Sequence, residues 1–407
     1  MQTRLQRIPP VRVLAFSIAA LAMVSIWTAG LSAATASVVL SGTRQTIRGF
    51  GGATAWLGQL TEAHMNTLFG TGPGTIGLSI LRVRIAPDSN WNDEVSNAQK
   101  AVARGGIVMA TPWTPPAYMK TNNNVVGGAL APSHYGSFAN YLNSFAGYMS
   151  SNGVNLYAIS VQNEPDISVT YESCDWTATQ LLNFARNNAG AISTRVIASE
   201  SFHFDKAYTD PILNDSTARA NVDIIGGHIY GSGLADYPLA RNSGKEVWMT
   251  EHLNTDTSIA GVIQTAKEIT DCLAVGNYNA YLWWYLKRYY GPMDDNGART
   301  KRGCVMAQFA RWVRPGFVRV NATYNPSPNV YVSAYKSGAR VVIVAVNTGS
   351  ASVNQTFSIS GGTLPTTLNV YRTSGSEDLA TLQTAGVSGG GFTASLPGQS
   401  ITTFVSP

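Results

Sequence analysis

The chain is poor in the residues that bind metal ions or form cross-links. Its 407 residues include three cysteines and five histidines. Three cysteines allow at most one disulfide, and Cys174, Cys272 and Cys304 lack the close pairing of a structural zinc site. We expect all three to be free, packed thiols. Because the histidines include no HExxH-type pattern, the sequence predicts neither a metal site nor a cofactor.

Charge is also scarce, at 13% of residues, and the formal net charge is +5. Three of the 28 basic residues lie in residues 1–36, which contain no acidic residue, so the remainder carries a net charge of about +2. This charge is too small and too dispersed to indicate nucleic acid as a partner.

The first 36 residues have the pattern of a secretory signal peptide. Arg4, Arg7 and Arg12 precede the apolar run "VLAFSIAALAMVSIW", and small residues ending in "AATA" follow it. We predict cleavage after Ala36, to within a few residues, and therefore a secreted, extracellular protein without a membrane segment after cleavage. A membrane anchor is the alternative, but the apolar run is rather short for one.

Residues 47–317 alternate between short apolar runs and stretches of helical spacing. Eight strands are predicted, at 47–54, 78–85, 106–113, 156–164, 195–201, 223–230, 246–252 and 280–286. Most intervals are about 30 residues, the length of a βα unit, and helical patterns at 135–153 and 258–276 fall between strands. Eight such units predict a (β/α)8 TIM barrel. A doubly wound open sheet competes, but no glycine-rich phosphate loop follows the first strand.

Residues 318–407 have a different pattern of apolar and polar residues. Short alternating runs are separated by Gly, Ser, Thr, Asn and Pro turns, which is typical of a β-sandwich. Residues 37–46 also read as strands, and we expect them to join this sandwich. Since no low-complexity linker separates the parts, the sandwich is predicted to associate tightly with the barrel. It shows no row of exposed aromatic residues, which favours a structural role.

Two glutamates follow predicted barrel strands. The fourth strand ends in "QNEPD" with Glu164, and the seventh ends in "MTEH" with Glu251. Because a TIM barrel carries its active site at the carboxyl ends of its strands, both should reach one rim. Other strands bring polar and aromatic residues to that rim: Arg82, Arg84, Trp113, His228, Tyr230 and the run "WWYLKRYYG".

Two carboxylates between aromatic walls suit glycoside hydrolysis. Two anions about 5–5.5 Å apart repel, which raises the pKa of one of them, and that separation implies retention of configuration; a wider gap implies inversion. Taken alone, a glutamate at a strand end is usually a solvated loop residue, and Trp113, Trp283 and Trp284 could be core aromatics. Of the adjacent pair we assign Trp284 to the cleft, by its spacing to Arg288.

Several motifs together resemble glycoside hydrolase family 30, and more narrowly its bacterial glucuronoxylan-specific endoxylanases. They are "RGFGGATAW", "TPWTPPAYMK", "VQNEPD", "GGHIYG", "WMTEH", "WWYLKRYYGPMDDNG" and "KRGCVMAQFARWVRPG". The resemblance covers nearly all of the chain after residue 36. An Asn-Glu-Pro sequence alone is moderately specific, whereas the whole set in this order is strong.

The resemblance implies roles for individual residues. Glu164 would be the general acid/base and Glu251 the nucleophile, with Asn163 bonding the 2-hydroxyl of the bound sugar. Tyr230 would orient Glu251, and Trp113 would stack on xylose. Further residues are placed on the same rim: Trp56, Trp91 and His228.

The narrower subgroup recognises a 4-O-methylglucuronic acid branch on xylan. By resemblance, Arg288 would bind the uronate carboxylate with Tyr290 beside it, and a planar guanidinium suits a carboxylate. Arg288 could instead tie down its own loop, and Lys287 competes for the role. The chain departs from the subgroup at Leu253, where these xylanases usually place a tyrosine, so we expect recognition of the branch to persist but to be weaker, or its subsite to be reshaped.

The sequence therefore predicts a secreted, monomeric, retaining endo-β-1,4-xylanase directed by uronic acid branches, a glucuronoarabinoxylan endo-1,4-β-xylanase. One alternative is the same chemistry on another glycan, such as a β-1,6-glucan or a glucosylceramide, which the basic "LKRYYG" loop disfavours. Another is a non-catalytic carbohydrate-binding protein, which the intact glutamate pair disfavours.

Overall fold

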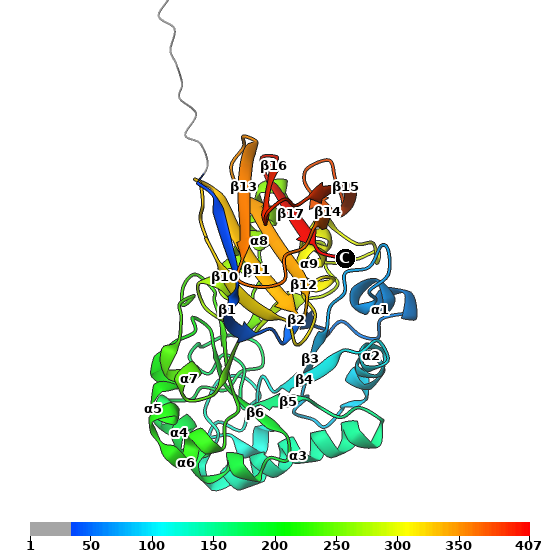
Figure 1. The fold of residues 1–407 in the computed structure, drawn as a ribbon. Coiled ribbons are helices and arrows are strands. Elements are labelled where there is room, and N and C mark those ends of the chain that lie inside the picture. Colours follow the sequence, from blue (N-terminus) through cyan, green and yellow to red (C-terminus); the bar gives the residue numbers. More distant parts are fainter. Residues whose placement is uncertain (1–33) are drawn as a thin grey trace, which may run out of the picture. The chain divides into compact units, whose positions relative to one another are not determined.

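A closed barrel of eight parallel strands forms the larger part of the molecule (Figure 1). The structure, a computed structural model, describes residues 34–407. The barrel strands are β2 (Gly49–Ala53), β3 (Ile80–Arg84), β4 (Ile107–Thr111), β5 (Ala158–Ser160), β6 (Arg195–Ser201), β7 (Ile224–His228), β8 (Glu246–Glu251) and β9 (Ala280–Tyr285). They pair in chain order, and β9 closes on β2. Each lies in a predicted strand range, so the predicted (β/α)8 barrel is confirmed.

Alternation along these strands builds two apolar layers. One set of side chains fills the barrel interior: Ile80, Met109, Ala158, Ile197, Ile224, Trp248, Ala280 and Leu282. Their neighbours in sequence, such as Leu81, Val108 and Ile225, point outward into the larger core. Because both faces are buried, the strands read as continuous apolar runs.

The helices alternate with the barrel strands along the chain, and the last helix follows the last of these strands. They are α1 (Glu62–Phe69), α2 (Asn92–Val102), α3 (Tyr135–Ser151), α4 (Ala178–Asn187), α5 (Asp210–Asn214), α6 (Ser216–Ala220), α7 (Pro238–Asn242), α8 (Ile259–Ala274) and α9 (Lys301–Ala310). Both predicted helices are present as α3 and α8. After α3 the chain turns at Gly153, whose φ of +76° is easily adopted only by glycine.

A second, mostly antiparallel sheet forms the β-sandwich. Its strands are β1 (Ala36–Thr46), β10 (Val318–Ala322), β11 (Val330–Ser337), β12 (Arg340–Asn347), β13 (Val353–Ser360), β14 (Thr367–Thr373), β15 (Ala380–Gly386), β16 (Gly391–Leu396) and β17 (Ser400–Val405). The order is β15-β14-β17-β12-β11-β10-β1-β13-β16, so β1 lies between β10 and β13. Phe357 and Phe392 pack across onto Phe404 at 5.4 and 5.1 Å between ring centroids, which brings the β13–β16 end over β17.

The sandwich packs directly against α8 and α9 of the barrel. The side chain of Gln308 on α9 donates to Thr373 Oγ1 at 3.0 Å, and Thr403 Oγ1 donates to the carbonyl of Gln308 at 3.0 Å. Trp312 stacks on Tyr371 at 4.2 Å. Apolar and polar contacts thus join the two parts, as the tight association predicted from sequence requires.

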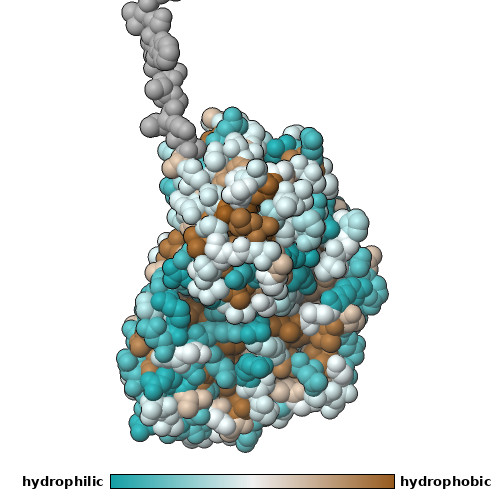
Figure 2. All heavy atoms as spheres, viewed as in Figure 1, coloured by the Kyte–Doolittle hydropathy of each residue, from teal (hydrophilic) through white to brown (hydrophobic). Residues whose placement is uncertain are grey.

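Hydrophilic residues are prominent on the surface of the barrel, and the cysteines are buried. Figure 2 shows hydrophilic residues spread over one face of the barrel, with apolar patches between them. Cys174, Cys272 and Cys304 are buried free thiols, as predicted. No helix within residues 34–407 has the length and apolar character needed to cross a membrane. Most of the predicted signal peptide lies outside the described residues.

Candidate active site

Glu164 and Glu251 meet at the carboxyl end of the barrel. Glu251 is the last residue of β8, and Glu164 lies in the turn that follows β5. One carboxylate oxygen of each lies within 4.8 Å of the other. Their exposed fractions are 5% and 6%, so both carboxyl groups are largely withdrawn from bulk water. At this distance in a buried site the two carboxyl groups interact strongly through their charges.

The backbone after β5 turns sharply to aim Glu164 into the barrel mouth. Glu164 has a φ of +45°, which is uncommon for a residue with a side chain. Its N–H donates to the carbonyl of Glu200 at 3.0 Å, and the N–H of Asn163 donates to the carbonyl of Pro112 at 2.9 Å. These bonds to neighbouring strand ends stabilise the turn.

Arg82 on β3 lies fully buried beneath the two glutamates. Its guanidinium forms an ion pair with Glu251 and donates to Asn163 Oδ1 at 2.7 Å. The same group lies 3.3 Å from Glu200 Oε1 and 4.6 Å from the ring centroid of Trp113. One cation therefore connects three strand ends and supports an aromatic wall.

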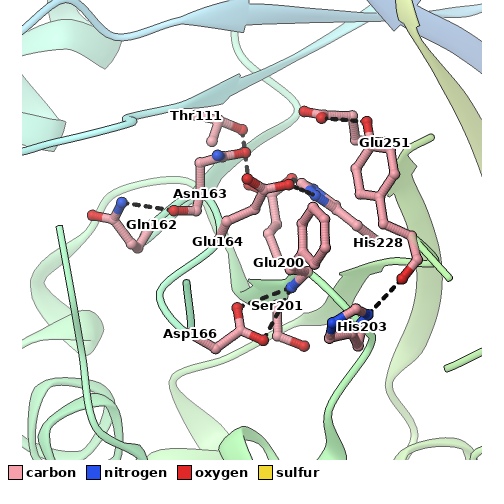
Figure 3. A network of polar contacts seen from close by, with 12 residues as sticks. Thr111, Gln162, Asn163, Glu164, Asp166, Glu200, Ser201, His203, His228 and Glu251 are labelled. Atoms are coloured by element: carbon pink, nitrogen blue, oxygen red, sulfur yellow. Dashed lines mark hydrogen bonds and ion pairs between the residues drawn. The ribbon is translucent and has the colours of Figure 1, made fainter. Parts of the chain in front are cut away.

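His228 at the end of β7 connects two carboxylates (Figure 3). Its Nδ1 lies 2.8 Å from Glu164 Oε1, and its Nε2 lies 3.8 Å from Glu200 Oε1. Burial favours the neutral imidazole, but the surrounding carboxylates of Glu251, Glu164 and Glu200 outweigh burial and raise the pKa of His228 to about 9. The ring is therefore a cation at neutral pH.

Glu200 and Glu251 respond differently to the same surroundings. Burial acts to raise the pKa of both, yet the charges of Arg82 and His228 hold the pKa of Glu200 down to about 2. For Glu251, burial and the charge of Glu164 raise the pKa, against the opposing effects of His228, Arg82 and Tyr230. The cluster contains two cations, Arg82 and His228, and three carboxyl groups. Its net charge is zero when the Glu164–Glu251 pair holds one proton.

Aromatic side chains form the walls of a cleft of about 510 Å³ above this cluster. Its lining comprises Trp56, Trp113, Glu164, Tyr171, Phe202, Tyr230, Glu251, Leu253, Trp284 and Tyr285. Trp113 lies 4.9 Å from Trp56 and 5.6 Å from Trp284, measured between ring centroids. Tyr230 donates to Glu251 Oε1 at 2.8 Å. Such a cleft offers flat apolar faces to sugar rings and two carboxyl groups to the bond between them.

The residues predicted to bind substrate fall into three groups. Trp56, Trp113, Tyr230 and Trp284 line the cleft, whereas Trp283 is fully buried in the core. Asn163 and His228 belong to the polar network around the glutamates. Arg288 and Tyr290 are not among the lining residues.

Arg288 is exposed on the loop after β9. Its guanidinium lies 5.3 Å from the ring centroid of Tyr285, which lines the cleft. Tyr290 is half-buried against the main core. Trp91 packs on Tyr141 of α3 and is not among the residues that line the cleft.

Several residues of the site were not singled out from the sequence. Tyr171 donates to Glu164 Oε2 at 3.3 Å, and Phe202 stacks on Tyr230 at 4.7 Å. Both lie in loops, where no apolar pattern marks them. Glu200 could have been noticed, because it is a charged residue that follows an apolar run within a predicted strand.

The donor atoms of Glu164, His228 and Glu251 all lie within 4.8 Å of one another, a spacing that a metal ion would accept. The ion pair of Arg82 with Glu251 already supplies positive charge to this group. His228 Nδ1 is bonded to Glu164 Oε1, and Tyr230 donates to Glu251 Oε1, so these atoms already have hydrogen-bond partners. The arrangement therefore suits two carboxyl groups acting on an organic substrate.

Comparison with known proteins places the chain among glycosidases. The family model described as glycosyl hydrolase family 59 matches residues 94–323. "Glucuronoxylanase XynC" of Bacillus subtilis (strain 168) is 45% identical over 394 residues, covering 92% of each chain.

Two solved structures match both the barrel and the sandwich. The glycoside hydrolase family 30 subfamily 8 xylanase Xyn30A from Clostridium acetobutylicum has a TM-score of 0.88 at 45% identity, covering 91% of this chain and 99% of that one. A GH30 endoxylanase from Clostridium papyrosolvens C71 has a TM-score of 0.86 at 44% identity, with the same coverage. The family 59 match is confined to part of the chain, so the full-length matches carry more weight.

Proposed function

The chain belongs to glycoside hydrolase family 30, and from that membership and the geometry of the cleft we propose that it is a retaining endo-β-1,4-xylanase. The observation that carries the proposal is the approach of Glu164 and Glu251 to within 4.8 Å between aromatic walls. An inverting enzyme needs about 6.5–9.5 Å between its carboxyl groups, to admit a water molecule. Xylan as the substrate is supported by the relatives that are named as xylanases.

In the proposed reaction Glu251 is the nucleophile and Glu164 the acid/base. A carboxylate oxygen of Glu251 bonds to the anomeric carbon while Glu164 gives its proton to the leaving oxygen, which breaks the glycosidic bond. Water deprotonated by Glu164 then cleaves the glycosyl ester. Arg82 and Tyr230 both bond Glu251, which favours its ionised form. Asn163 accepts from Arg82, so its amide N–H remains available to the sugar 2-hydroxyl.

Substitution of each glutamate tests these roles. Glu164→Gln and Glu251→Gln should each abolish xylan hydrolysis without loss of the fold, whereas Glu246→Gln, at the opposite end of β8, should retain activity. Azide should rescue the alanine variants with opposite stereochemistry. Glu251→Ala should give an α-glycosyl azide and Glu164→Ala a β-glycosyl azide, measured by NMR on an activated aryl xyloside. Near wild-type turnover by either glutamine variant would refute the assignment.

We propose further that a 4-O-methylglucuronosyl branch directs cleavage through Arg288, with Tyr290 beside it. The backbone N–H of Arg288 donates to the carbonyl of Met293 at 3.0 Å, so its loop is held without the guanidinium. The side chain is exposed next to Tyr285 of the cleft wall. Leu253 presents an apolar surface to the cleft, so this subsite lacks one hydroxyl contact.

Arg288→Ala should lower kcat/KM on glucuronoxylan far more than on unbranched xylo-oligosaccharides. Lys287→Ala is the matched control and should affect both substrates alike. Mass analysis of wild-type products should find one uronate at a fixed distance from each reducing end. Leu253→Tyr should increase the preference for branched substrate. Equal losses on both substrates for Arg288→Ala would remove the branch-reading role.

We also propose that residues 1–36 direct export. Ala36 opens β1 and is fully buried, and Gln355 donates to the carbonyl of Ala34 at 2.7 Å. Cleavage before Ala34 would preserve both contacts, whereas cleavage after Ala36 would remove them. N-terminal sequencing of protein from culture medium should give a first residue between 34 and 37; an uncleaved, cell-bound chain would contradict export.

A further inference from the structure

Glu200 is a buried carboxylate that has no part in the reaction proposed above. It lies near the end of β6 with an exposed fraction of 0% and does not line the cleft. Its φ of +50° places it in the left-handed region. Such a conformation in a charged, buried residue persists only where the surroundings determine it.

The contacts of Glu200 connect four other strand ends. Thr111 Oγ1 on β4 donates to Glu200 Oε2 at 3.0 Å (Figure 3). Arg82 on β3 and His228 on β7 approach Glu200 Oε1 at 3.3 and 3.8 Å. The carbonyl of Glu200 accepts the N–H of Glu164 in the turn after β5. Both cations of the site are therefore shared between Glu200 and the cleft glutamates.

We propose that Glu200 is a positioning residue that holds Arg82 and the ring of His228 against Glu164 and Glu251, and so retains on this cluster the proton needed for catalysis. The proposal rests on the proposed glycosidase function. Without Glu200, two buried cations would face two carboxyl groups, and a proton shared by those groups would be less favourable. The negative charge of Glu200 balances one of the two cations, so a Glu164–Glu251 pair that holds one proton is stable beside both Arg82 and His228.

The direction of the effect follows from the charges that face Glu200. These charges belong to Arg82, His228, Glu164 and Glu251, and Asp166 also acts on His228. Removing one anion weakens proton binding by the whole cluster, whichever member releases the proton. A charge at this distance shifts a pKa by about 1–3 units.

Glu200→Gln keeps the shape of the side chain and removes its charge. On xylan, the basic limb of its kcat/KM–pH profile should move to lower pH by about one unit or more, and kcat at the optimum should fall. Glu200→Asp should restore the position of the limb, because it restores the charge. Glu246→Gln, which removes the partner of Arg48 at the opposite end of the barrel, should leave the limb unchanged. A wild-type limb in folded Glu200→Gln would overturn the proposal.

A second measurement needs no substrate. NMR titration of the histidine rings, with His228→Asn to assign the signal, should show His228 still protonated at pH 8 in the wild type. In Glu200→Gln the midpoint should fall by about one unit or more. A wild-type His228 that is neutral at pH 7 would overturn the proposal even if the variant did not fold. If His228 titrates as expected but xylan is not cleaved, only the proposed function fails.

Discussion

At the scale of single residues, the charge balance of the cleft depends on Arg82. It has no contact with solvent, and it bonds Glu251, Asn163 and Thr111 while also lying beside Glu200. Within this cluster of described residues, no other cationic side chain lies beside all four of these residues. Losing this cation would leave buried carboxylates without compensation, which is costly even where the intact ion pair contributes little.

We predict that Arg82→Met lowers the free energy of unfolding by about 3–5 kcal/mol and kcat/KM on xylan by at least about 100-fold, since it removes a bond to the nucleophile. Urea unfolding and steady-state kinetics measure both. Arg48→Met is the matched control, because Arg48 forms a partly exposed ion pair with Glu246 at the other end of the barrel. Equal losses for the two variants would contradict the role of Arg82.

Glu94 gives a prediction for the pH dependence of stability. It is 7% exposed on α2 and accepts from Thr54 Oγ1 at 3.1 Å, and burial raises its pKa to about 7. Because the folded state holds this proton more tightly than the unfolded state, the contribution of Glu94 to stability is complete below pH 4.5 and is lost as pH rises through about 7.

Glu94→Gln removes this titration. The variant should match the wild type near pH 4.5 and exceed it by up to about 3 kcal/mol at pH 8. Urea unfolding at the two pH values measures the difference. A difference that is the same at both values would show that Glu94 does not titrate between them.

The sequence indicated the two glutamates more readily than the rest of the site. Glu164 and Glu251 each end an apolar run, and parallel strands bring such ends to one rim. Glu200 also follows an apolar run, but its contacts to Arg82 and His228 depend on side-chain directions that sequence spacing does not determine. Tyr171 reaches Glu164 from a loop, and loops carry no periodic pattern.

At the scale of elements, the barrel strands were predictable and their ends less so. Burial on both faces produces apolar runs at intervals that match βα units, which accounts for all eight strands. β5 spans Ala158–Ser160, shorter than the predicted 156–164, because the following amides bond elsewhere. Gln162 donates to the carbonyl of Trp113 at 2.7 Å, and the N–H of Glu164 donates to Glu200. The active-site residues therefore follow directly after the last residues of β5 that pair with neighbouring strands.

The helix after this turn provides a prediction about capping. Thr177 accepts from the N–H of Gln180, whose side chain in turn accepts from the N–H of Thr177, forming a capping box at the start of α4. Thr177→Ala should lower the free energy of unfolding by about 1 kcal/mol. Ser144→Ala, at an exposed position inside α3, should change it by less than about 0.5 kcal/mol. Urea unfolding measures both, and equal effects would argue against the cap.

At the scale of the whole molecule, barrel and sandwich share one apolar core. Val342, Val344 and Ile401 of the sandwich belong to the same buried cluster as the outward-facing residues of the barrel strands. The buried bonds of Gln308 to Thr373 and Thr403 cross the same boundary. Separating the parts would expose this surface to water, so we expect them to unfold together.

The distribution of tryptophan makes cooperative unfolding testable in the intact chain. All nine tryptophans lie at or before residue 312, and Trp312 stacks on Tyr371 of the sandwich. In a Trp312→Phe background, tryptophan fluorescence therefore reports on the barrel and not on residues 318–407. Phe404 is fully buried inside the sandwich, and Phe404→Ala should destabilise it by about 3–5 kcal/mol. If the two parts unfold as one, the midpoint seen by tryptophan fluorescence falls together with the midpoint seen by circular dichroism.

Leu364→Ala is the control for this experiment, since Leu364 is an exposed residue of the sandwich, and it should move neither midpoint. A fluorescence midpoint that stays at the wild-type value in Phe404→Ala would mean that the barrel is stable alone. The sandwich would then be an attached domain, and the contacts through α8 and α9 would contribute little free energy. Coincident shifts would instead identify the sandwich as part of the structure that maintains the barrel and, through it, the geometry of the two glutamates.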